Sequence, residues 1–373
     1  MALNNGTKRG VFLALLILSV ALKFGFPVQA QGRPVEVRIL ERWVDRTVEV
    51  RIPAGTSVQP GFAGNGRLLI KASESQLLLN GNLVLGPELH IGRPVDSSTF
   101  EIHWKGRKRK YPGMLRVRAE SDQLVLLNVL PLETYVSGVV SAEMPESWPL
   151  PALRAQAVLA RTLALKGGDH PGGRLCDLTH CQVYAGDRNS DAVHVAQETR
   201  GQVLTYRGAL IQPLFHSTCG GERASNATIF GGAALPYLQE GTDPYCDGSP
   251  HAAGWSVRVL ESELAHALDV DQLKRLEVIE QSQGGWVARI SRDGFPMTGY
   301  RFWQAVGKQL GWGVLKSMRF NVRHEDNAYV FEGKGLGHGV GLCQWGAKGQ
   351  ADKGIPHARI LGSYYPGTTI VHR

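Results

Sequence analysis

Glu143 is the residue of this 373-residue chain whose type and position best suit acid–base chemistry. Pro145 disfavours helical backbone at Met144, so a helix that precedes them is expected to end at Glu143. Apolar residues recur at helical spacing along that helix, and the next step of their stripe falls on Glu143. The stripe is formed by Leu132, Tyr135, Val136, Val139 and Val140. The sequence therefore predicts a carboxyl that faces inward at a helix end.

The pKa of a carboxyl in that position is expected to rise. Burial penalises the charged form, and the negative end of the helix dipole penalises it further. A carboxylic acid that keeps its proton near neutral pH can protonate a leaving group. The alternative for Glu143 is an ordinary charged residue at a solvated helix end.

The elements that position Glu143 predict a mixed α+β fold. Over residues 35–118, short alternating segments punctuated by Gly, Pro, Asn and Asp are typical of antiparallel strands. Another strand over residues 123–130 leads directly into the helix that ends at Glu143. We expect a β-rich N-terminal lobe over residues 31–110. A mixed catalytic domain with a helical core around the Glu-Met-Pro motif is expected over residues 111–373.

Further helices are expected after Glu143. The clearest covers Ala152–Lys166, with Pro151 in its first turn and two glycines at its end. Arg161 on this helix is expected either in a surface salt bridge or against an anionic ligand. Helices are also predicted near Glu261–Ala267 and over Gly299–Leu310.

The first residues have the pattern of a targeting segment. Lys8 and Arg9 precede the apolar run Val11–Leu22, and Val28–Ala30 fits a small-x-small cleavage site. Residues 1–30 are therefore predicted to be a signal peptide, and the protein to be exported to the periplasm or the cell wall. The apolar run is short for a membrane span, so membrane attachment is expected only through an uncleaved leader.

The formal net charge of +8 favours an anionic partner outside the cell. The densest basic run, Lys105–Lys110, is interpreted as a solvated hairpin tip. The sequence contains no nucleic-acid motif, so no nucleic-acid partner is expected.

Three groups of motifs resemble the stage II sporulation protein D family (SpoIID/LytB domain), in order over residues 111–369. The first group is Tyr111–Leu115, Asn128–Tyr135, Glu143–Pro145 and Leu153–Thr162. The second is Ser217–Gly221, Leu235–Leu238 and Asp243–Cys246, and the third is Gly335–Ala347 and Tyr364–Thr368. The chain departs from the family at Cys343, where Ser is usual, and at Leu336, which replaces a common aromatic residue.

The resemblance implies a peptidoglycan lytic transglycosylase. Such an enzyme cleaves the MurNAc–GlcNAc β-1,4 bond and leaves a 1,6-anhydroMurNAc end, with Glu143 as general acid and then base. No cofactor is implied for catalysis. Glycan strands of peptidoglycan are the implied partner. The LytB branch implies an alternative, a non-catalytic wall-binding module that enhances a cell-wall amidase.

The same motifs supply the expected sugar-binding residues. The glycines after Ser217 allow close backbone approach to a ligand, and His338 lies between two more glycines. The alternative for Trp345 is core packing. A second carboxylate, if one is required, would be Asp243 or, after it, Glu146. The full expected set is Arg161, Ser217, Gly220, Gly221, Tyr237, Asp243, His338, Gln344 and Trp345.

The resemblance also implies a structural zinc site in some members. Here the corresponding residues are His170, Cys176, His180 and Cys181, a donor set that suits tetrahedral zinc. A Cys176–Cys181 disulfide is the alternative in an exported protein.

The odd number of cysteines has a further consequence. Cys219 and Cys246 would form a second pair and leave Cys343 unpaired.

Overall fold

The computed structural model describes residues 34–373 except residues 45, 61, 64, 65, 85, 169 and 171–173. The predicted signal peptide over residues 1–30 lies outside the described residues. Within the described part of the chain, no helix has both the length and the apolar character that crossing a bilayer requires. The fold is mixed α+β, as the sequence predicts.

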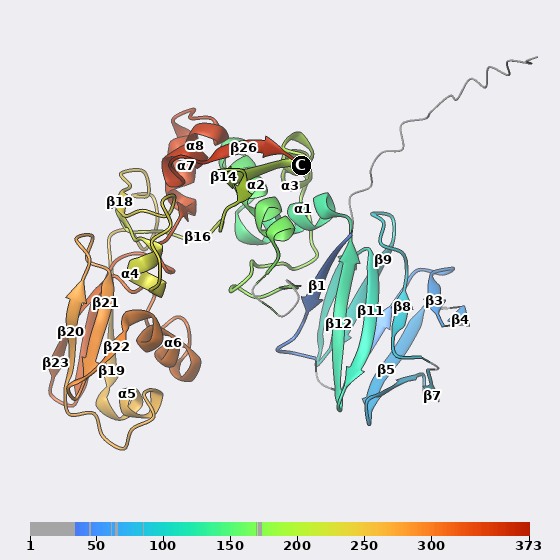
Figure 1. The fold of residues 1–373 in the computed structure, drawn as a ribbon. Coiled ribbons are helices and arrows are strands. Elements are labelled where there is room, and N and C mark those ends of the chain that lie inside the picture. The colour runs from blue at the N-terminus through green and yellow to red at the C-terminus, as the bar shows by residue number, and fades with distance from the viewer. Residues whose placement is uncertain are drawn as a thin grey trace, which may run out of the picture. The chain divides into compact units, whose positions relative to one another are not determined.

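Two β-sheets form the N-terminal part of the described chain (Figure 1). The strands of the first sheet, in spatial order, are β13 (Leu175–Cys176), β1 (Val35–Ile39), β12 (Gln123–Leu130), β11 (Met114–Glu120), β8 (Leu89–Ile91), β3 (Ser57–Gln59) and β4 (Phe62–Ala63). The strands of the second are β10 (Arg107–Pro112), β9 (Thr99–Trp104), β2 (Thr47–Arg51), β5 (Arg67–Ser73), β6 (Gln76–Leu79) and β7 (Asn82–Leu83). The predicted hairpin tip at Lys105 is the turn between β9 and β10.

Buried and exposed side chains alternate along these strands, which explains how the two sheets enclose a core. In β5 and β9 every second residue is buried, so each strand turns one apolar face to the core and one polar face outward. β12 is buried on both faces beyond its first residue. It pairs with β1 and β11, and one hydrophobic core joins both sheets to the helices that follow. The boundary expected between residues 110 and 111 falls inside β10, so the N-terminal lobe is continuous with the rest of the fold.

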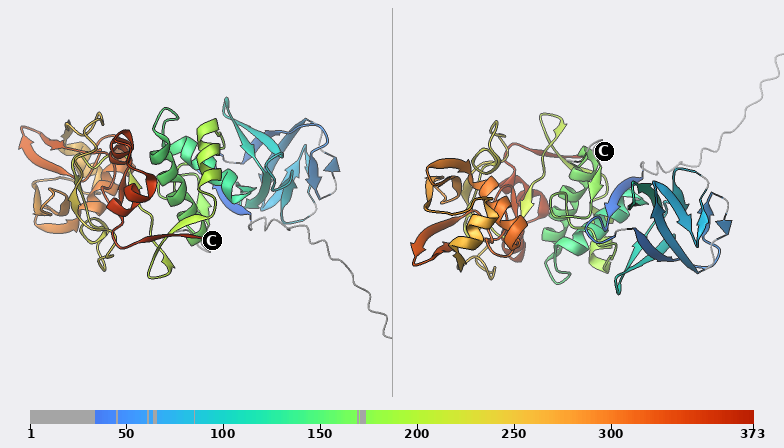
Figure 2. Two further views of the ribbon diagram at one scale, coloured as in Figure 1. Left: turned by 90° about the horizontal axis from the view of Figure 1, so that it is seen from above. Right: turned by 90° about the horizontal axis from the view of Figure 1, so that it is seen from below.

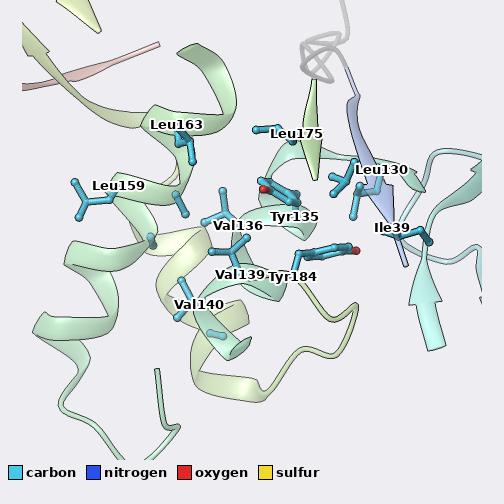
Figure 3. Packing of buried hydrophobic residues seen from close by; sticks show 14 of the residues in the cluster. Ile39, Leu130, Tyr135, Val136, Val139, Val140, Leu159, Leu163, Leu175 and Tyr184 are labelled. Atoms are coloured by element: carbon cyan, nitrogen blue, oxygen red, sulfur yellow. The ribbon is translucent and has the colours of Figure 1, made fainter. Parts of the chain in front are cut away.

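Helix α1 (Leu132–Glu143) follows β12 after Pro131 and ends where the sequence predicts. Met144 caps it in an extended conformation, with φ −133° and ψ 140°. Residues 134–140 are all buried, and Figure 3 shows Val136 and Val139 in the core beside Tyr135 and Tyr184. Because the middle of α1 is buried on every side, the helix is held in place, and Glu143 at its end is held with it.

Three more helices pack on α1 or on its neighbour α2 (Leu150–Lys166). They are α3 (Ser190–Glu198), α7 (Gln344–Asp352) and α8 (His357–Tyr364). The short α4 (Asn226–Phe230) instead contacts β21 (Val287–Arg292) and α6 (Gly299–Leu310). A small sheet orders β15 (Ala209–Leu210), β14 (Gln202–Tyr206) and β26 (Thr369–His372). Two-stranded pairs join β16 (Phe215–His216) to β25 (Leu342–Cys343), and β17 (Glu222–Arg223) to β18 (Gly241–Thr242).

Residues 255–333 build a second hydrophobic core of their own. One sheet orders β19 (Trp255–Leu260), β24 (Ala328–Gly333) and β23 (Phe320–Glu325). The other orders β20 (Leu276–Gln281), β21 (Val287–Arg292) and β22 (Phe295–Thr298). The helices are α5 (Glu261–Ala267) and α6 (Gly299–Leu310), both with the bounds that the sequence predicts. Figure 2 shows these elements, coloured in yellow-orange to orange, from two further sides.

Candidate active site

A cavity of about 780 Å³ opens beside the C-terminal end of α1. Its wall contains residues from α1, β16, the Gly-rich loop before β25, the first residue of α7, and α6. Segments more than 150 residues apart in the sequence therefore meet around one space. Of the expected site residues, Glu143, His180, Cys181, Ser217, His338 and Gln344 line this cavity.

Glu143 is half-buried at the cavity wall. The backbone N–H of Val183 donates a hydrogen bond of 2.6 Å to its Oε1. The side-chain amide of Gln344 lies 3.4 Å from both Oε2 and the backbone carbonyl of Glu143. The carboxyl is therefore held by two donors from distant segments while it faces the cavity.

The pKa of Glu143 is raised from 4.5 to about 7, because burial penalises its charged form. The hydrogen bonds from Val183 and Gln344 oppose this rise. A carboxyl with a pKa near 7 exchanges its proton readily at neutral pH, which is the property that a general acid and base requires.

Gln344 and Trp345 begin α7, and their roles differ. Gln344 reaches Glu143, whereas Trp345 packs edge-on against Trp148 with ring centroids 5.0 Å apart. Trp345 is absent from the cavity wall. Trp148 lies in the turn after Glu143, so Trp345 anchors α7 to that turn and thereby positions Gln344.

Two histidines face each other in the cavity wall, His216 from β16 and His338 from the Gly-rich loop. Their ring centroids are 5.6 Å apart. His338 Nδ1 accepts a hydrogen bond from the Val340 N–H, and His216 Nδ1 lies 3.2 Å from the Val340 carbonyl. Burial lowers the pKa of His216 to about 3 and that of His338 to about 4, so both rings are neutral at pH 7.

The glycine after His338 has a packing reason. Gly339 has φ +77°, and a Cβ there would lie 2.2 Å from the Trp286 ring. Only glycine lets the loop pass this close and still present His338 to the cavity.

Aromatic side chains form another part of the wall. Phe230 of α4 lies edge-on to Tyr300 of α6, with centroids 5.0 Å apart. Trp303, one helical turn later, lies edge-on to Trp312 at 5.0 Å. All four line the cavity, and Phe230 and Trp312 are exposed. Such apolar ring faces suit the C–H faces of a pyranose.

Cationic side chains are also present at this cavity. Arg42, Lys308 and Lys316 line it. Among the described residues Glu143 is the only carboxylate in the wall. The charge around Glu143 therefore favours an anionic ligand.

Arg161 does not reach the cavity, which corrects the expected ligand contact. Its side chain is fully buried, and its guanidinium pairs with both carboxylate oxygens of Glu133, at 3.0 and 2.5 Å. It also donates to the backbone carbonyls of Ala196 and Gln202. Arg161 thus ties α1, α2, α3 and β14 together, neither on the surface nor at a ligand.

The remaining expected residues lie outside the cavity wall. The Tyr237 hydroxyl accepts a hydrogen bond from the Gln212 N–H and is buried. The Gly220 carbonyl accepts one from Arg319, and the Gly221 carbonyl accepts one from the backbone N–H of Asp243.

The two candidates for a second carboxylate also lie outside the wall. Asp243 is buried and accepts a hydrogen bond of 2.7 Å from the Tyr364 hydroxyl. Glu146 is exposed and accepts one from Ser190. Within the described part of the chain, neither carboxylate faces Glu143 across the cavity.

His170, Cys176, His180 and Cys181 come together at the edge of the cavity. Their four ligand atoms all lie within 4.8 Å of one another. His180 Nε2 is 2.9 Å from His170 Nε2 and 3.2 Å from Cys176 Sγ. The pKa of Cys181 is lowered by a hydrogen bond from the Cys176 thiol and by His170. Two thiols and two imidazoles at this spacing fit the donor set of a tetrahedral zinc ion.

Sequence reasoning missed His216 and the aromatic wall. His216 directly precedes the Ser-Thr-Cys-Gly-Gly motif, and that adjacency was an available signal. Tyr300 and Trp303 lie at i and i+3 on a predicted helix, a spacing that places two aromatic rings on one face. Their proximity to Glu143 depends on the second core and has no local signal.

Residues 120–206 match the sequence model of the family described as Stage II sporulation protein. Stage II sporulation protein D of Bacillus subtilis is 30% identical over 266 residues, which cover 65% of this chain and 74% of that protein. The chain belongs to the stage II sporulation protein D family.

Two further relatives extend the comparison. An uncharacterized protein of Brachyspira hyodysenteriae is 33% identical over 271 residues, covering 70% of this chain and 72% of that protein. A protein named amidase enhancer from Bacillus subtilis is 26% identical over 300 residues, covering 63% of this chain and 40% of that protein.

Proposed function

We propose that this protein is an exported lytic transglycosylase of peptidoglycan, with Glu143 as its single acid–base residue. The observation that carries the proposal is the isolation of Glu143. It is the only carboxylate among the described residues of the cavity wall, and its pKa is raised to about 7.

A single carboxyl favours this reaction over hydrolysis. Glycosidases that use water generally need two carboxylates, one as acid and one as nucleophile or base. A muramic acid residue carries its own nucleophile, the 6-hydroxyl, which is already held next to C1. Intramolecular attack gains from effective molarity, so no second carboxylate is needed to activate water.

In the proposed reaction Glu143 acts twice. Its carboxylic acid gives a proton to the bridging oxygen as the bond between that oxygen and C1 of MurNAc breaks. The 6-hydroxyl oxygen then bonds to C1, and its proton passes to the Glu143 carboxylate. The products are a free GlcNAc 4-hydroxyl and a 1,6-anhydroMurNAc end, and Glu143 is protonated again.

The rest of the cavity suits a glycan strand. The aromatic wall of Phe230, Tyr300, Trp303 and Trp312 offers ring faces to sugars. Lys308 and Lys316 also line the cavity, and their positive charge suits the carboxylate that muramic acid carries. His216 and His338 are neutral and therefore add no charge beside Glu143.

We further propose that His170, Cys176, His180 and Cys181 hold a structural zinc ion. When bound, the ion would cross-link the segment that contributes Val183, the donor to Glu143. Catalysis itself would need no cofactor. The rival is a Cys176–Cys181 disulfide, which peptide mapping of the unreduced protein would detect as a cross-linked peptide.

The test of the proposed activity is product analysis. Purified protein is incubated with glycan strands from which an amidase has removed the stem peptides, and mass spectrometry measures anhydro-muramic ends. Wild type should release them, whereas Glu143→Gln should not. The matched control is Glu146→Gln, because Glu146 is exposed and absent from the cavity wall. Equal product from wild type and Glu143→Gln would overturn the assignment.

The similarity to an amidase enhancer supports a second candidate function. In that case the cavity would bind the wall, and the protein would stimulate a partner amidase without cleaving glycan. The same preparation decides between the two. The enhancer is favoured if wild type releases no anhydro ends but raises the rate at which an amidase releases stem peptides. Glu143→Gln should then raise that rate as much as wild type does.

A further inference from the structure

A second group of metal-ligating side chains lies outside the cavity wall. Cys219, Asp243, Cys246 and Cys343 place their ligand atoms within 4.8 Å of one another. The three cysteines are fully buried, and Asp243 is 2% exposed. The four residues come from three segments: the loop after β16, the loop after β18, and the end of β25.

The distances within this group match tetrahedral zinc. With Zn–S bonds of about 2.3 Å, two thiolates of one tetrahedron lie about 3.8 Å apart, and a thiolate and a carboxylate oxygen about 3.6 Å apart. Cys219 Sγ is 3.7 Å from Cys246 Sγ and 3.6 Å from Asp243 Oδ2. Two of the six separations expected around one ion are therefore already present, and the other four are within 4.8 Å.

Neighbouring donors hold the ligand atoms in a form that suits a cation. The Gly221 N–H donates to Cys246 Sγ at 3.1 Å, and the Gly346 N–H donates to Cys343 Sγ at 3.2 Å. Cys343 also caps the N-terminus of α7, where the helix dipole favours negative charge. Hydrogen bonds to the ligands from a surrounding shell are a regular feature of metal sites.

The carboxylate of Asp243 is oriented in the same way. Tyr364 donates to Oδ2 and the Tyr245 N–H donates to Oδ1. A Cβ at Gly346 would lie 2.2 Å from Oδ2, so glycine is needed there to admit the carboxylate. A Cys219–Cys246 disulfide would use two of the four groups and leave a buried thiol and a buried carboxylate with no common partner. One ion uses all four.

We propose that Cys219, Asp243, Cys246 and Cys343 bind a second structural zinc ion. The ion would join the loops after β16 and β18 to the start of α7. Cys343 precedes Gln344, so the site would fix the residue whose amide reaches Glu143. The inference concerns metal content and stands whether or not the chain cleaves glycan.

The test is the zinc content of the full chain, measured by inductively coupled plasma mass spectrometry. Cys343→Ser should remove one zinc equivalent per chain. Serine is a strong N-cap, so this variant keeps the cap of α7. Asp243→Asn, which keeps the side-chain shape, should weaken zinc retention during dialysis against a chelator. Cys181→Ser is the matched control, because it changes the other cluster and should leave this equivalent in place.

Cobalt gives a second readout. Wild-type protein loaded with Co²⁺ should show thiolate-to-cobalt absorption from this site, and Cys343→Ser should lose part of it while circular dichroism confirms that the variant is folded. Unchanged zinc content in both Cys343→Ser and Asp243→Asn would overturn the proposal. A Cys219–Cys246 cross-linked peptide in the unreduced wild type would overturn it as well.

Discussion

Glu143 and the aromatic residues of α6 face one cavity, but the helices that carry them contribute their buried residues to two different hydrophobic cores. Glu143 ends a helix whose middle is buried on every side in the first core. Tyr300 and Trp303 project from a strongly amphipathic helix whose other face contributes Phe302 and Val306 to the second core. One wall therefore holds a single group rigidly, whereas the other presents a broad apolar surface.

This difference separates two tasks. A proton donor must be held within a fraction of an ångström of the bond it protonates, so a position at the end of a buried helix suits it. Ring faces contribute affinity over a wide contact area and tolerate small displacements. We expect changes on the Glu143 wall to act on kcat, and changes on the aromatic wall to act on KM.

Glu143→Gln should give the largest effect of any change at the cavity. Removing a general acid typically costs about 10²- to 10⁴-fold in rate, and we expect a loss in that range in kcat for release of anhydro-muramic ends. KM should change little, because the amide keeps the shape of the side chain. Glu146 lies outside the cavity wall, so an equal loss in kcat for Glu146→Gln would contradict the assignment of the acid to Glu143.

Thermal denaturation provides the control for folding of this variant. The pKa of Glu143 is higher in the folded protein, about 7, than the ordinary value of 4.5. The folded state therefore binds the proton more tightly, and wild type loses stability as pH rises from 4.5 through 7. Glu143→Gln lacks this loss, so above pH 7 its Tm should equal or exceed that of wild type.

If Glu143 is the proposed acid, the pH dependence of the wild-type activity should follow the protonation of Glu143. The carboxylic acid is the form that donates, so activity should be high below pH 7 and fall about tenfold per pH unit above it. The measurement is kcat/KM between pH 5 and pH 9, inclusive. His216 and His338 are neutral over this range, since their pKa values are about 3 and 4, and should not add a second inflection. Activity that rises steadily above pH 7 would exclude Glu143 as the proton donor.

Local sequence patterns predicted most of the helices and strands in which apolar residues recur at a regular spacing. The strands around Ile70 and Ile102 alternate, and α1, α5 and α6 end where punctuation or periodicity changes. Helix α7 was not predicted from the sequence, because its glycines are typical of a loop. The structure gives Gly346 a different purpose, since it makes room for the Asp243 carboxylate from about 100 residues away.

The site could be predicted only where a motif is itself part of the wall. Glu143, His338 and Gln344 belong to motifs and line the cavity. The place of Arg161 could not be read from α2, because α3 and β14 cover that face and supply its partners. Likewise, the sequence of α6 shows an aromatic face, but only the tertiary fold brings that face to the same cavity as Glu143.

On the aromatic wall, Trp312→Ala should raise KM about tenfold and leave kcat within about twofold. Trp312 is 41% exposed and lines the cavity, so its removal takes away ligand surface with little loss of core packing. Phe295→Ala is the matched control, because Phe295 is 66% exposed in the same region but absent from the wall. Steady-state kinetics on defined glycan strands gives both constants. A fall in kcat without a rise in KM would place Trp312 with the catalytic wall instead.

Gln344→Met should give the smallest effect and tests how finely the Glu143 wall is tuned. The amide of Gln344 lowers the pKa of Glu143, but its contacts are 3.4 Å long and therefore weak. Its loss should move the alkaline limb of the pH profile upward, with only a few-fold change in kcat at the optimum. Lys348→Ala on the same helix, outside the wall, should leave the profile in place. A shift toward lower pH in Gln344→Met would mean that the amide stabilises the protonated acid. In that case the Glu143 carboxyl would donate the hydrogen bond and the Gln344 amide oxygen would accept it.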